Sequence, residues 1–501
     1  MTRSERAAAP PVRTSELLAP ADLPARARAL LGAGFRLALV AGHDDGGALR
    51  VVYVFCAGPP DRRVELQVRL DTARPALPSL AAFSFPAGRF ERELADLFGI
   101  EPVGHPFLRP LVRHQHWPRD WHPMRRDAGP VPPMLLDAEP FPFAAVEGPG
   151  VYEIPVGPVH AGLIEPGHFR FFVVGETILK MKARLWFVHR GIERLFEGRQ
   201  VAEGVVLAER VSGDTAAAHA LAYCLAVEDA LAIEVPHDAR LLRALVVELE
   251  RITNHVADLG ALCNDVGFGV AHARALTLRE RLLRLAGEVT GHRLLRNAIR
   301  PGAAALRRLP TEAELAGVEA QVEDLVELAT SNTVVMDRFK GTAVLSRGDA
   351  EAIGALGVVA RASGLAVDAR MAHPFCDIQA GLVPVVEEAG DVLARYSVRA
   401  REVAASLRLV AELAGRVRSL EASALDLGRR GGSGIGIVEG WRGTIVHRVE
   451  VGADGHLTRA KIVDPSFLTW PALSVALADT IVPDFPLANK SFNLSYAGND
   501  L

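Results

Sequence analysis

Residues 238–265 have the sequence DARLLRALVVELERITNHVADLGALCND, in which apolar residues recur every three or four positions. These residues are Leu241, Leu242, Leu245, Val246, Leu249, Ile252, Val256 and Leu259. Because this spacing puts them on one face of an α-helix, the stretch predicts a long helix that faces the core. Similar patterns run through residues 271–297, 312–337 and 387–420, so the sequence predicts a helical bundle.

On the N-terminal side of this bundle, residues 30–70 contain three short apolar runs separated by Gly, Asp and Pro. The runs are LALVAGHD, LRVVYVFC and VELQVRL. This pattern predicts a small antiparallel sheet. A helix ended by Gly99 is expected next, with an apolar face formed by Phe90, Leu94, Leu97 and Phe98.

A proline-rich segment, DAGPVPPMLLDAEPFPFAAVEGPG at residues 127–150, divides the chain. Prolines at this density interrupt both helices and sheet ladders. We therefore expect an α+β domain over residues 1–128, a linker over 129–150, and a mainly helical domain with peripheral strands over 151–501. The predicted fold class is α+β.

The second domain is expected to begin and end with strands. Short apolar runs with turns follow residue 151, before a helix starts. Residues 433–464 read SGIGIVEGWRGTIVHRVEVGADGHLTRAKIVD and predict a hairpin or small sheet, with its turn at Ala453-Asp454-Gly455.

The composition excludes several classes of protein. The 56 basic and 60 acidic residues are interleaved and give a net charge of -4, so we expect no nucleic-acid partner. The sequence has no signal-like apolar region at its start and no apolar run long enough to span a bilayer, so we expect a soluble, cytoplasmic chain. The cysteines lie too far apart for a metal clamp and are expected to be buried thiols; they are Cys56, Cys224, Cys263 and Cys376.

A small-residue turn at Ser212-Gly213-Asp214-Thr215 follows Glu209-Arg210 and precedes an alanine-rich helix. The spacing could place the hydroxyls of Ser212 and Thr215 on one helical face. It also suits a C-x-x-C metal clamp, but no cysteine is present. A nucleophilic role for these hydroxyls is not supported, because no adjacent general base with a triad pattern can be named.

Four motifs together resemble a known family. They are FERELADLFGIEPVGHPFLRPL at residues 90–111, VHRGIERL at 188–195, VELERITNHVADLGALCNDVGF at 247–268 and EGWRGTIVHRVE at 439–450. In this order they resemble the large subunit of the energy-converting (group 4) [NiFe]-hydrogenases, including formate hydrogenlyase. They are also similar to two subunits of complex I, the peripheral-arm subunit and the quinone-site subunit, here fused. The resemblance covers nearly all of the chain, and the family is associated with NAD.

The resemblance implies a metal site that this sequence has lost. The hydrogenases bind nickel and iron through four cysteine thiolates, in an R-x-C-G-x-C motif and a D-P-C-x-x-C motif. The matching positions here are Ser212, Thr215, Ser495 and Gly498. Neutral hydroxyls are poor ligands for nickel and glycine offers none, so neither a nickel–iron centre nor hydrogen turnover is expected.

The quinone ligands of complex I are also displaced. Its quinone-binding tyrosine falls on Gly213, and its histidine falls near Pro166, with His160 and His168 close by. The acidic residue that complex I places beside that histidine is retained as Asp265.

The resemblance assigns roles to further residues. Glu165 with His160 and His168 is a candidate proton relay, with solvated or capped loop groups as the alternative. Arg442 matches an arginine that lies over the hydrogenase metal site. Arg190 matches an arginine near the last iron–sulfur cluster.

Catalytic or proton roles are thus expected for Glu165, His168, Asp265 and Arg442. Roles near a partner cluster or the cavity are expected for Arg190, His160 and Arg210. For Glu250, Arg251, Asn254 and His255, helical spacing favours ordinary intrahelical ion pairs.

The implied function is that of a metal-free core subunit in a membrane-bound oxidoreductase complex. No cofactor is expected on this chain; a [4Fe–4S] cluster is expected in a small partner subunit, and a quinone is one candidate acceptor. Other expected partners are antiporter-like membrane subunits, which places the chain peripherally on the cytoplasmic side of the inner membrane. One alternative is a scaffold without chemistry, and another is a working [NiFe]-hydrogenase.

Overall fold

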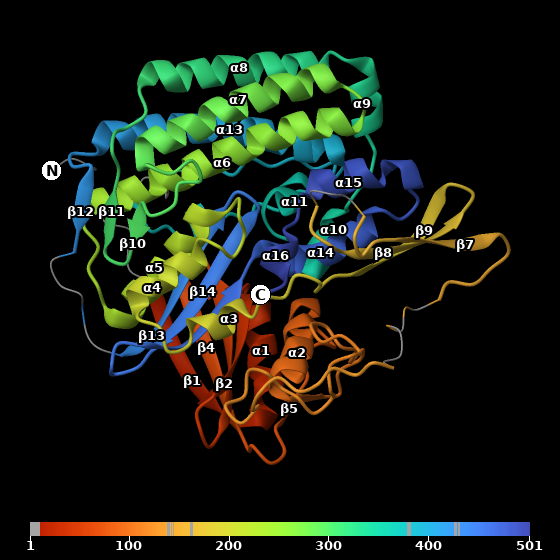
Figure 1. Cartoon of the computed structure of the whole chain (residues 1–501), viewed down its shortest axis with the longest axis vertical. Coiled ribbons are helices and arrows are strands. Elements are labelled where there is room, and N and C mark those ends of the chain that lie inside the picture. The colour runs from red at the N-terminus through yellow and green to blue at the C-terminus, as the bar shows by residue number, and fades with distance from the viewer. Residues whose placement is uncertain are drawn as a thin grey trace.

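The computed structural model describes residues 11–137, 141, 143, 145–160, 164–377, 382–424, 428 and 431–501, and its fold is α+β as predicted (Figure 1). The strands are β1 Val12–Leu18, β2 Arg36–Asp44, β3 Leu49–Ala57, β4 Arg62–Leu70, β5 Ala76–Pro78, β6 Glu101–Val103, β7 Val151–Val156, β8 His168–Val174, β9 Thr177–Arg184, β10 Ile299–Arg300, β11 Ala303–Ala305, β12 Glu421–Ser423, β13 Gly432–Gly440, β14 Gly443–Val451 and β15 Leu457–Val463. The helices are α1 Leu23–Gly32, α2 Phe85–Phe98, α3 Ile192–Phe196, α4 Val201–Ala208, α5 Ala216–Leu231, α6 His237–Asp265, α7 Gly269–Thr290, α8 Glu312–Thr330, α9 Thr333–Phe339, α10 Arg347–Ile353, α11 Gly357–Ala362, α12 Ala369–Ala372, α13 Val392–Arg416, α14 Pro465–Ala476, α15 Phe485–Phe492 and α16 Tyr496–Asn499.

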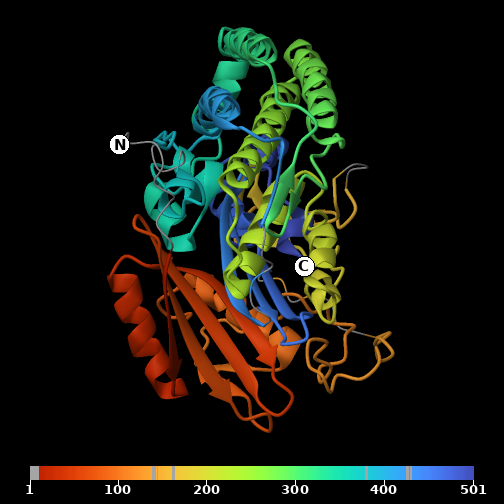
Figure 2. The same ribbon diagram turned by 90° about the vertical axis from the view of Figure 1, so that its left-hand side faces the viewer.

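The first domain is a four-stranded sheet in the order β1-β4-β3-β2, with α1 and α2 beside it (Figures 1 and 2). The antiparallel β2–β3–β4 part was predicted, but β1 pairs parallel to β4, which the sequence did not indicate. No apolar pattern marks this strand, because both of its faces are largely exposed. Helix α2 begins at the Ser84 cap and ends at Gly99, whose φ of 68° lies in the left-handed region that glycine favours.

The predicted bundle is built from α6, α7, α8 and α13, which lie side by side at the top of Figure 1. The helix ends differ from the predicted spans because capping residues interrupt the apolar pattern. Gly291, at φ 92°, ends α7 before residue 297. Asn332 caps α9 and divides the predicted 312–337 helix in two. Asp391 caps α13, which therefore begins after residue 387.

Between the bundle and the first domain lies the three-stranded sheet β13–β15, with the predicted hairpin between β14 and β15 (Figure 1). The alanine-rich α5 packs directly on β13. A Cβ at Gly434 would lie 2.0 Å from the carbonyl oxygen of Ala226, and one at Gly436 would lie 1.9 Å from that of Ala222. The two glycines therefore permit the close approach that seats α5 and the turn before it.

The two predicted domains share one packed core. Buried residues of β2, β3 and α2 form a continuous cluster with residues of β13, α14 and α15. The Lys461 ammonium of β15 also lies 2.7 Å from Glu93 in α2. The domain boundaries stay a prediction, but the contact between the domains is extensive and buried.

None of the helices that the structure describes is both long enough and apolar enough to cross a bilayer. The hairpin arm β7–β9 extends to one side of the molecule, at the right of Figure 1.

Candidate functional site

The turn at residues 212–215 lies before α5 rather than on it, so the expectation that its hydroxyls share a helical face is wrong. Thr215 is the N-cap residue of α5, and Ser212 lies in the turn ahead of it. Thr215 has a φ of -131° and a ψ of 43°, which is not helical backbone, and the helix begins only at Ala216. The turn nevertheless brings both hydroxyls to one carboxylate, since Ser212 Oγ and Thr215 Oγ1 each donate to Asp214 Oδ1 at 3.0 Å.

The segment around α16 meets this turn. The hydroxyl oxygens of Ser212 and Ser495 are 2.9 Å apart, although 283 positions separate them in the sequence. Ser495 caps α16 by accepting from the backbone N–H of Gly498 at 2.8 Å. The structure thus brings together the segments that carry all four former ligand positions.

Arg442 and Asp214 form the centre of this group. Arg442 Nη1 and Nη2 donate to the two oxygens of Asp214 at 2.5 and 2.7 Å, in a bidentate pair. Arg442 also donates to Thr215 Oγ1 at 3.1 Å and to the carbonyl of Asn493 at 2.6 Å. Burial alone would raise the pKa of Asp214, but Arg442 and the two hydroxyls lower it to about 2. The turn therefore holds a fixed ion pair at the positions that the family resemblance assigns to metal ligands.

These residues do not fit a nickel–iron centre. A Cβ at Gly498 would lie 2.5 Å from Asp464 Cγ, so this carboxylate fills the space of the fourth ligand side chain. Asp464 is held there by His219 Nε2 at 3.1 Å and by the backbone N–H of Ser466 at 2.8 Å. The other three positions offer one hydroxyl each, a donor set unsuited to nickel. Among the described residues, no group of three or more His, Cys, Asp or Glu side chains is arranged to hold a metal ion.

Glu250 belongs to the site, which its helical spacing did not indicate. It accepts from the backbone N–H groups of Ala217 and Ala218 at 2.7 and 3.1 Å, at the start of α5. Burial raises its pKa to about 8, with the charge of Asp214 acting in the same direction. A cavity of about 260 Å³ is lined by Asp214 and Glu250 together with Arg279 and other residues of α6 and α7. No sequence signal indicates this contact, because the partners of Glu250 are backbone N–H groups.

Asp265 lies away from this centre, at the end of α6. Burial raises its pKa, while Lys490 and His272 oppose the rise. The α6 residue nearer the centre is Asp258, which accepts from Asn493 Nδ2 at 2.6 Å. Asp265 follows Asp258 by seven positions, about 10 Å along the helix axis.

The three candidate relay residues are not joined to one another by a hydrogen bond among the described residues. Glu165 is exposed, and its Oε2 accepts from the backbone N–H of Ala497 at 3.0 Å, which ties it to the α16 segment. His168 lies 3.4 Å from Arg170 Nε, and burial and then Arg170 lower its pKa. His160 contacts the carbonyl of Pro158 at 3.2 Å. Of the three, Glu165 alone touches the former metal segments through a hydrogen bond within the described part of the chain.

Arg190 and Arg210 lie on the exposed side of the 212–215 turn. Arg190 donates to the carbonyls of Arg210 and Val211 at 3.1 and 2.8 Å, and so fixes the backbone that leads into the turn. Arg210 donates to the carbonyl of Val206 at 2.7 Å and leaves its guanidinium at the surface. Both cations are therefore available to a partner on this face.

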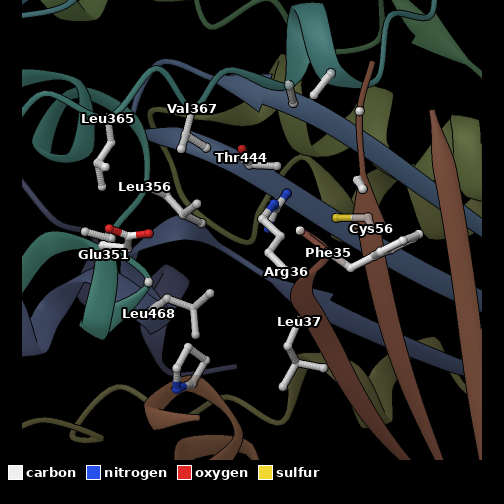
Figure 3. Close-up of a pocket in the computed structure, with 18 of the residues that line it drawn as sticks. Phe35, Arg36, Leu37, Cys56, Glu351, Leu356, Leu365, Val367, Thr444 and Leu468 are labelled. Carbon is white, nitrogen blue, oxygen red and sulfur yellow. The ribbon is translucent and has the colours of Figure 1, made fainter. Parts of the chain in front are cut away.

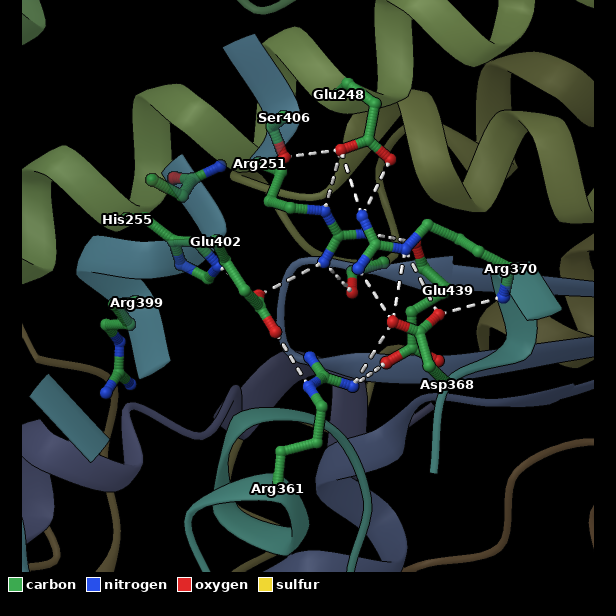
Figure 4. Close-up of polar contacts among 12 residues, drawn as sticks. Glu248, Arg251, His255, Arg361, Asp368, Arg370, Arg399, Glu402, Ser406 and Glu439 are labelled. Carbon is green, nitrogen blue, oxygen red and sulfur yellow. Dashed lines mark hydrogen bonds and ion pairs between the residues drawn. The ribbon is translucent and has the colours of Figure 1, made fainter. Parts of the chain in front are cut away.

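Behind the site lies a fully buried network of charges (Figure 4). Its members are Glu248, Arg251, His255, Arg361, Asp368, Arg370, Glu402, Ser406 and Glu439. Arg251 donates to the carbonyls of Glu439 and Gly440 at 2.7 and 3.1 Å, directly before Trp441 and Arg442 in the chain. The network thereby positions the loop that carries Arg442.

Three family models match separate parts of the chain. The family model of the respiratory-chain NADH dehydrogenase 49 kDa subunit matches residues 265–427, and that of the 30 kDa subunit matches 17–132. The nickel-dependent hydrogenase model matches residues 190–263.

Among curated relatives, hydrogenase-4 component G of Escherichia coli is 33% identical over 423 residues, covering 82% of this chain and 73% of the relative. Formate hydrogenlyase subunit 5 of the same organism is 31% identical, covering 87% and 79%. The fused C/D protein of the NADH-quinone oxidoreductase of Phocaeicola vulgatus is 30% identical, covering 68% and 70%.

A solved structure shares the fold. A chain of the membrane-bound sulfane sulfur reductase, described as an archaeal respiratory membrane complex, has a TM-score of 0.64 and 25% identity. The match covers 70% of the present chain and 99% of that chain.

Proposed function

Because the chain belongs to the family of large subunits that [NiFe]-hydrogenases share with complex I, we propose that it is the metal-free core subunit of a membrane-bound oxidoreductase complex. The observation that carries this proposal is the bidentate Asp214–Arg442 pair at the former metal positions. The relatives named above belong to hydrogenase, formate hydrogenlyase and NADH-quinone oxidoreductase.

In this proposal the chain supplies charge and protons to the cavity. A [4Fe–4S] cluster in a small partner subunit supplies the electrons, and the exposed Arg190 and Arg210 mark the face against which that partner packs. Arg442 provides a fixed cation beside the acceptor, for which a quinone is the leading candidate. Glu250, whose pKa is raised to about 8, holds a proton at neutral pH and delivers it to the cavity. Asp265, whose pKa burial also raises, carries protons towards the cavity along α6. Glu165, which is exposed and hydrogen-bonded to the α16 segment, links the cavity to solvent, and His168 is a second candidate proton carrier.

The proposed partners include antiporter-like membrane subunits, and the proposed location is the cytoplasmic face of the inner membrane. Similarity to a chain of an archaeal respiratory membrane complex supports this arrangement.

A second candidate is a scaffold without chemistry. The closed ion pair and the filled space beside Gly498 favour it, because both reduce the room for an acceptor. The first candidate predicts that the purified complex reduces an acceptor and that acidic residues near the cavity affect the rate. The scaffold predicts no such reduction.

The test uses the purified complex, a reduced viologen as donor and a short-chain quinone as acceptor. Wild-type complex is expected to reduce the quinone, and Asp265→Asn to lower the rate by about 100-fold or more, as loss of a general acid does. Asp324→Asn makes the same chemical change on the exposed face of α8 and should leave the rate unchanged.

Assembly of each variant is checked by co-purification of the partner subunits. Absence of quinone reduction in the assembled wild-type complex would support the scaffold. Stoichiometric nickel with hydrogen evolution would instead establish a working hydrogenase and overturn both.

A further inference from the structure

A second cavity, of about 660 Å³, lies between the first domain and the segments that contain α10, α11 and α12 (Figure 3). Apolar side chains of both domains line it, among them Phe35, Leu37, Leu356, Val367 and Leu468. Its volume is typical of small-molecule sites, and its position between domains is a common one for them.

A cation and a thiol face this space from adjacent strands. Arg36 of β2 and Cys56 of β3 are direct partners in the sheet register. Figure 3 shows the sulfur of Cys56 pointing toward the Arg36 side chain, with Glu351 on the opposite side of the cavity. Within the described residues, the Arg36 guanidinium has no hydrogen-bond or ion-pair partner. It is therefore free to pair with an anionic ligand.

Cys56 is also the first member of a Cys–His–Asp arrangement. Its thiol hydrogen-bonds to the imidazole of His373, which comes from the second domain. His373 Nδ1 lies 2.8 Å from Asp61 Oδ1, and Asp61 accepts in turn from Arg63 Nη2 at 2.7 Å. An imidazole fixed by a carboxylate in this way takes the proton of a neighbouring thiol.

The charges that face Cys56 favour its thiolate. Burial raises the pKa of the thiol, but Arg36, His373 and Arg63 outweigh burial and the pKa is lowered. Burial lowers the pKa of His373, yet Asp61 and the thiol raise it above its usual value. The charges around the sulfur thus favour a thiolate beside a protonated imidazole.

Two other cysteines provide the contrast. Burial raises the pKa of Cys224 well above its usual value and that of Cys263 to about 12. Neither lines the interdomain cavity. All three thiols are buried, as the sequence predicted, but Cys56 is hydrogen-bonded to an imidazole and lines a cavity.

We propose that Cys56 is a thiol–disulfide exchange site for small disulfides that carry a carboxylate and enter the interdomain cavity. This proposal is independent of the function proposed above. The Cys56 thiolate attacks one sulfur of the incoming disulfide, and a new S–S bond to Cys56 forms as the original S–S bond breaks. The other half leaves as a thiolate and takes up the proton that His373 holds. Arg36 pairs with the carboxylate of the incoming disulfide.

The test uses the purified complex and 5,5′-dithiobis(2-nitrobenzoate), a disulfide with a carboxylate on each half, with peptide mass mapping to locate the label. At pH 7 Cys56 is expected to react at least about tenfold faster than Cys224 or Cys263, because thiolate fraction and access control the rate. The pH at half-maximal rate should lie below the value of about 8.5 for a free thiol.

Two variants separate the roles of the neighbours. His373→Gln should slow the labelling of Cys56 about tenfold at pH 7 and move its pH profile upward. Arg36→Gln should slow the reaction with the dicarboxylate disulfide more than that with the uncharged 2-hydroxyethyl disulfide, because loss of the cation raises the pKa of Cys56 in both reactions but removes a carboxylate partner in only one.

Wild-type complex alone can overturn the proposal. The proposal is overturned if Cys56 is labelled no faster than Cys224. It is also overturned if the pH at half-maximal labelling rate is at or above the value for a free thiol. Neither result requires the variants to fold. Equal slowing of both disulfides by Arg36→Gln would remove the carboxylate requirement and contradict the stated ligand class.

Discussion

Asp214 and Asp464 decide the chemical character of the former metal site. Asp214 places a carboxylate between the hydroxyls of Ser212 and Thr215, and Asp464 occupies the space beside Gly498. The site therefore presents fixed charges at the positions that the family resemblance assigns to metal ligands. A cysteine introduced at Gly498 would meet the carboxylate of Asp464.

Glu250 gives this site a measurable pH dependence. Its carboxyl titrates near 4.3 in the unfolded chain and at about 8 when folded. Between these values the folded state binds more protons, so this residue's contribution to stability is complete below pH 4.3 and is lost as pH rises toward 8. Glu250→Gln removes that loss, and the variant should gain on the order of 4 kcal/mol relative to wild type across this range.

The measurement is the difference in melting temperature between Glu250→Gln and wild type at several pH values from 4.5 to 8.5. The difference should move in favour of the variant as pH rises. Glu323→Gln, on the exposed face of α8, serves as the control and should give a constant difference. A constant difference for Glu250→Gln as well would show that this carboxyl is ionised throughout.

Helices α6, α11 and α13 are joined by the buried network of Figure 4. Glu402 of α13 lies 2.8 Å from His255 Nε2 and 2.7 Å from Arg361 Nε, and all three side chains are fully buried. Removing one charge from such a network leaves its partners buried without compensation. These ion pairs therefore fix how the helices sit against one another.

Glu402→Gln should lower the free energy of unfolding by about 3–5 kcal/mol. Glu412→Gln is the matched control on the same helix, since Glu412 pairs with Arg416 at the surface and its loss should cost less than about 0.5 kcal/mol. Denaturant unfolding of both variants provides the comparison. Similar costs for the two would mean that the network does not hold the helices together.

The elements were more predictable from sequence than the site. Periodicity located the bundle helices, because each buries one apolar stripe along its length. The partners of the site could not be located in this way. Ser212 contacts Ser495 although more than half of the sequence lies between them. Arg251 donates to the backbone carbonyl of Glu439, and a backbone atom carries no sequence signal. Family resemblance named the four former ligand positions, but it could not indicate that Asp464 fills one of them.

Over the whole molecule, the two domains behave as one packed unit. Their shared core and the buried contacts of Lys461 with Glu93 and of Arg448 with Glu65 join the first domain to the β13–β15 sheet. The described residues 129–137 of the connecting segment are mostly exposed, and Leu136 is 97% exposed.

A protease site inserted between Val131 and Leu136 should therefore cut the chain without separating its parts. The two fragments are expected to elute together in size exclusion, even in about 1 M NaCl, because apolar contacts are not screened by salt. Mixing with denaturant should separate them. Separate elution under native conditions would show that the domains depend on the covalent connection.

The meeting of Ser212 with Ser495 also constrains how the protein is made. Residues 491–500 supply one side of the site, and Asp500 accepts from the backbone N–H of Val188 at 2.9 Å. During translation the 212–215 turn leaves the ribosome almost 300 residues before these partners exist. The sheet of the first domain is likewise covered only after β13–β15 have been synthesised. Final closure must therefore follow synthesis of the last of these segments, and until then a chaperone or the partner subunit has access to the open site.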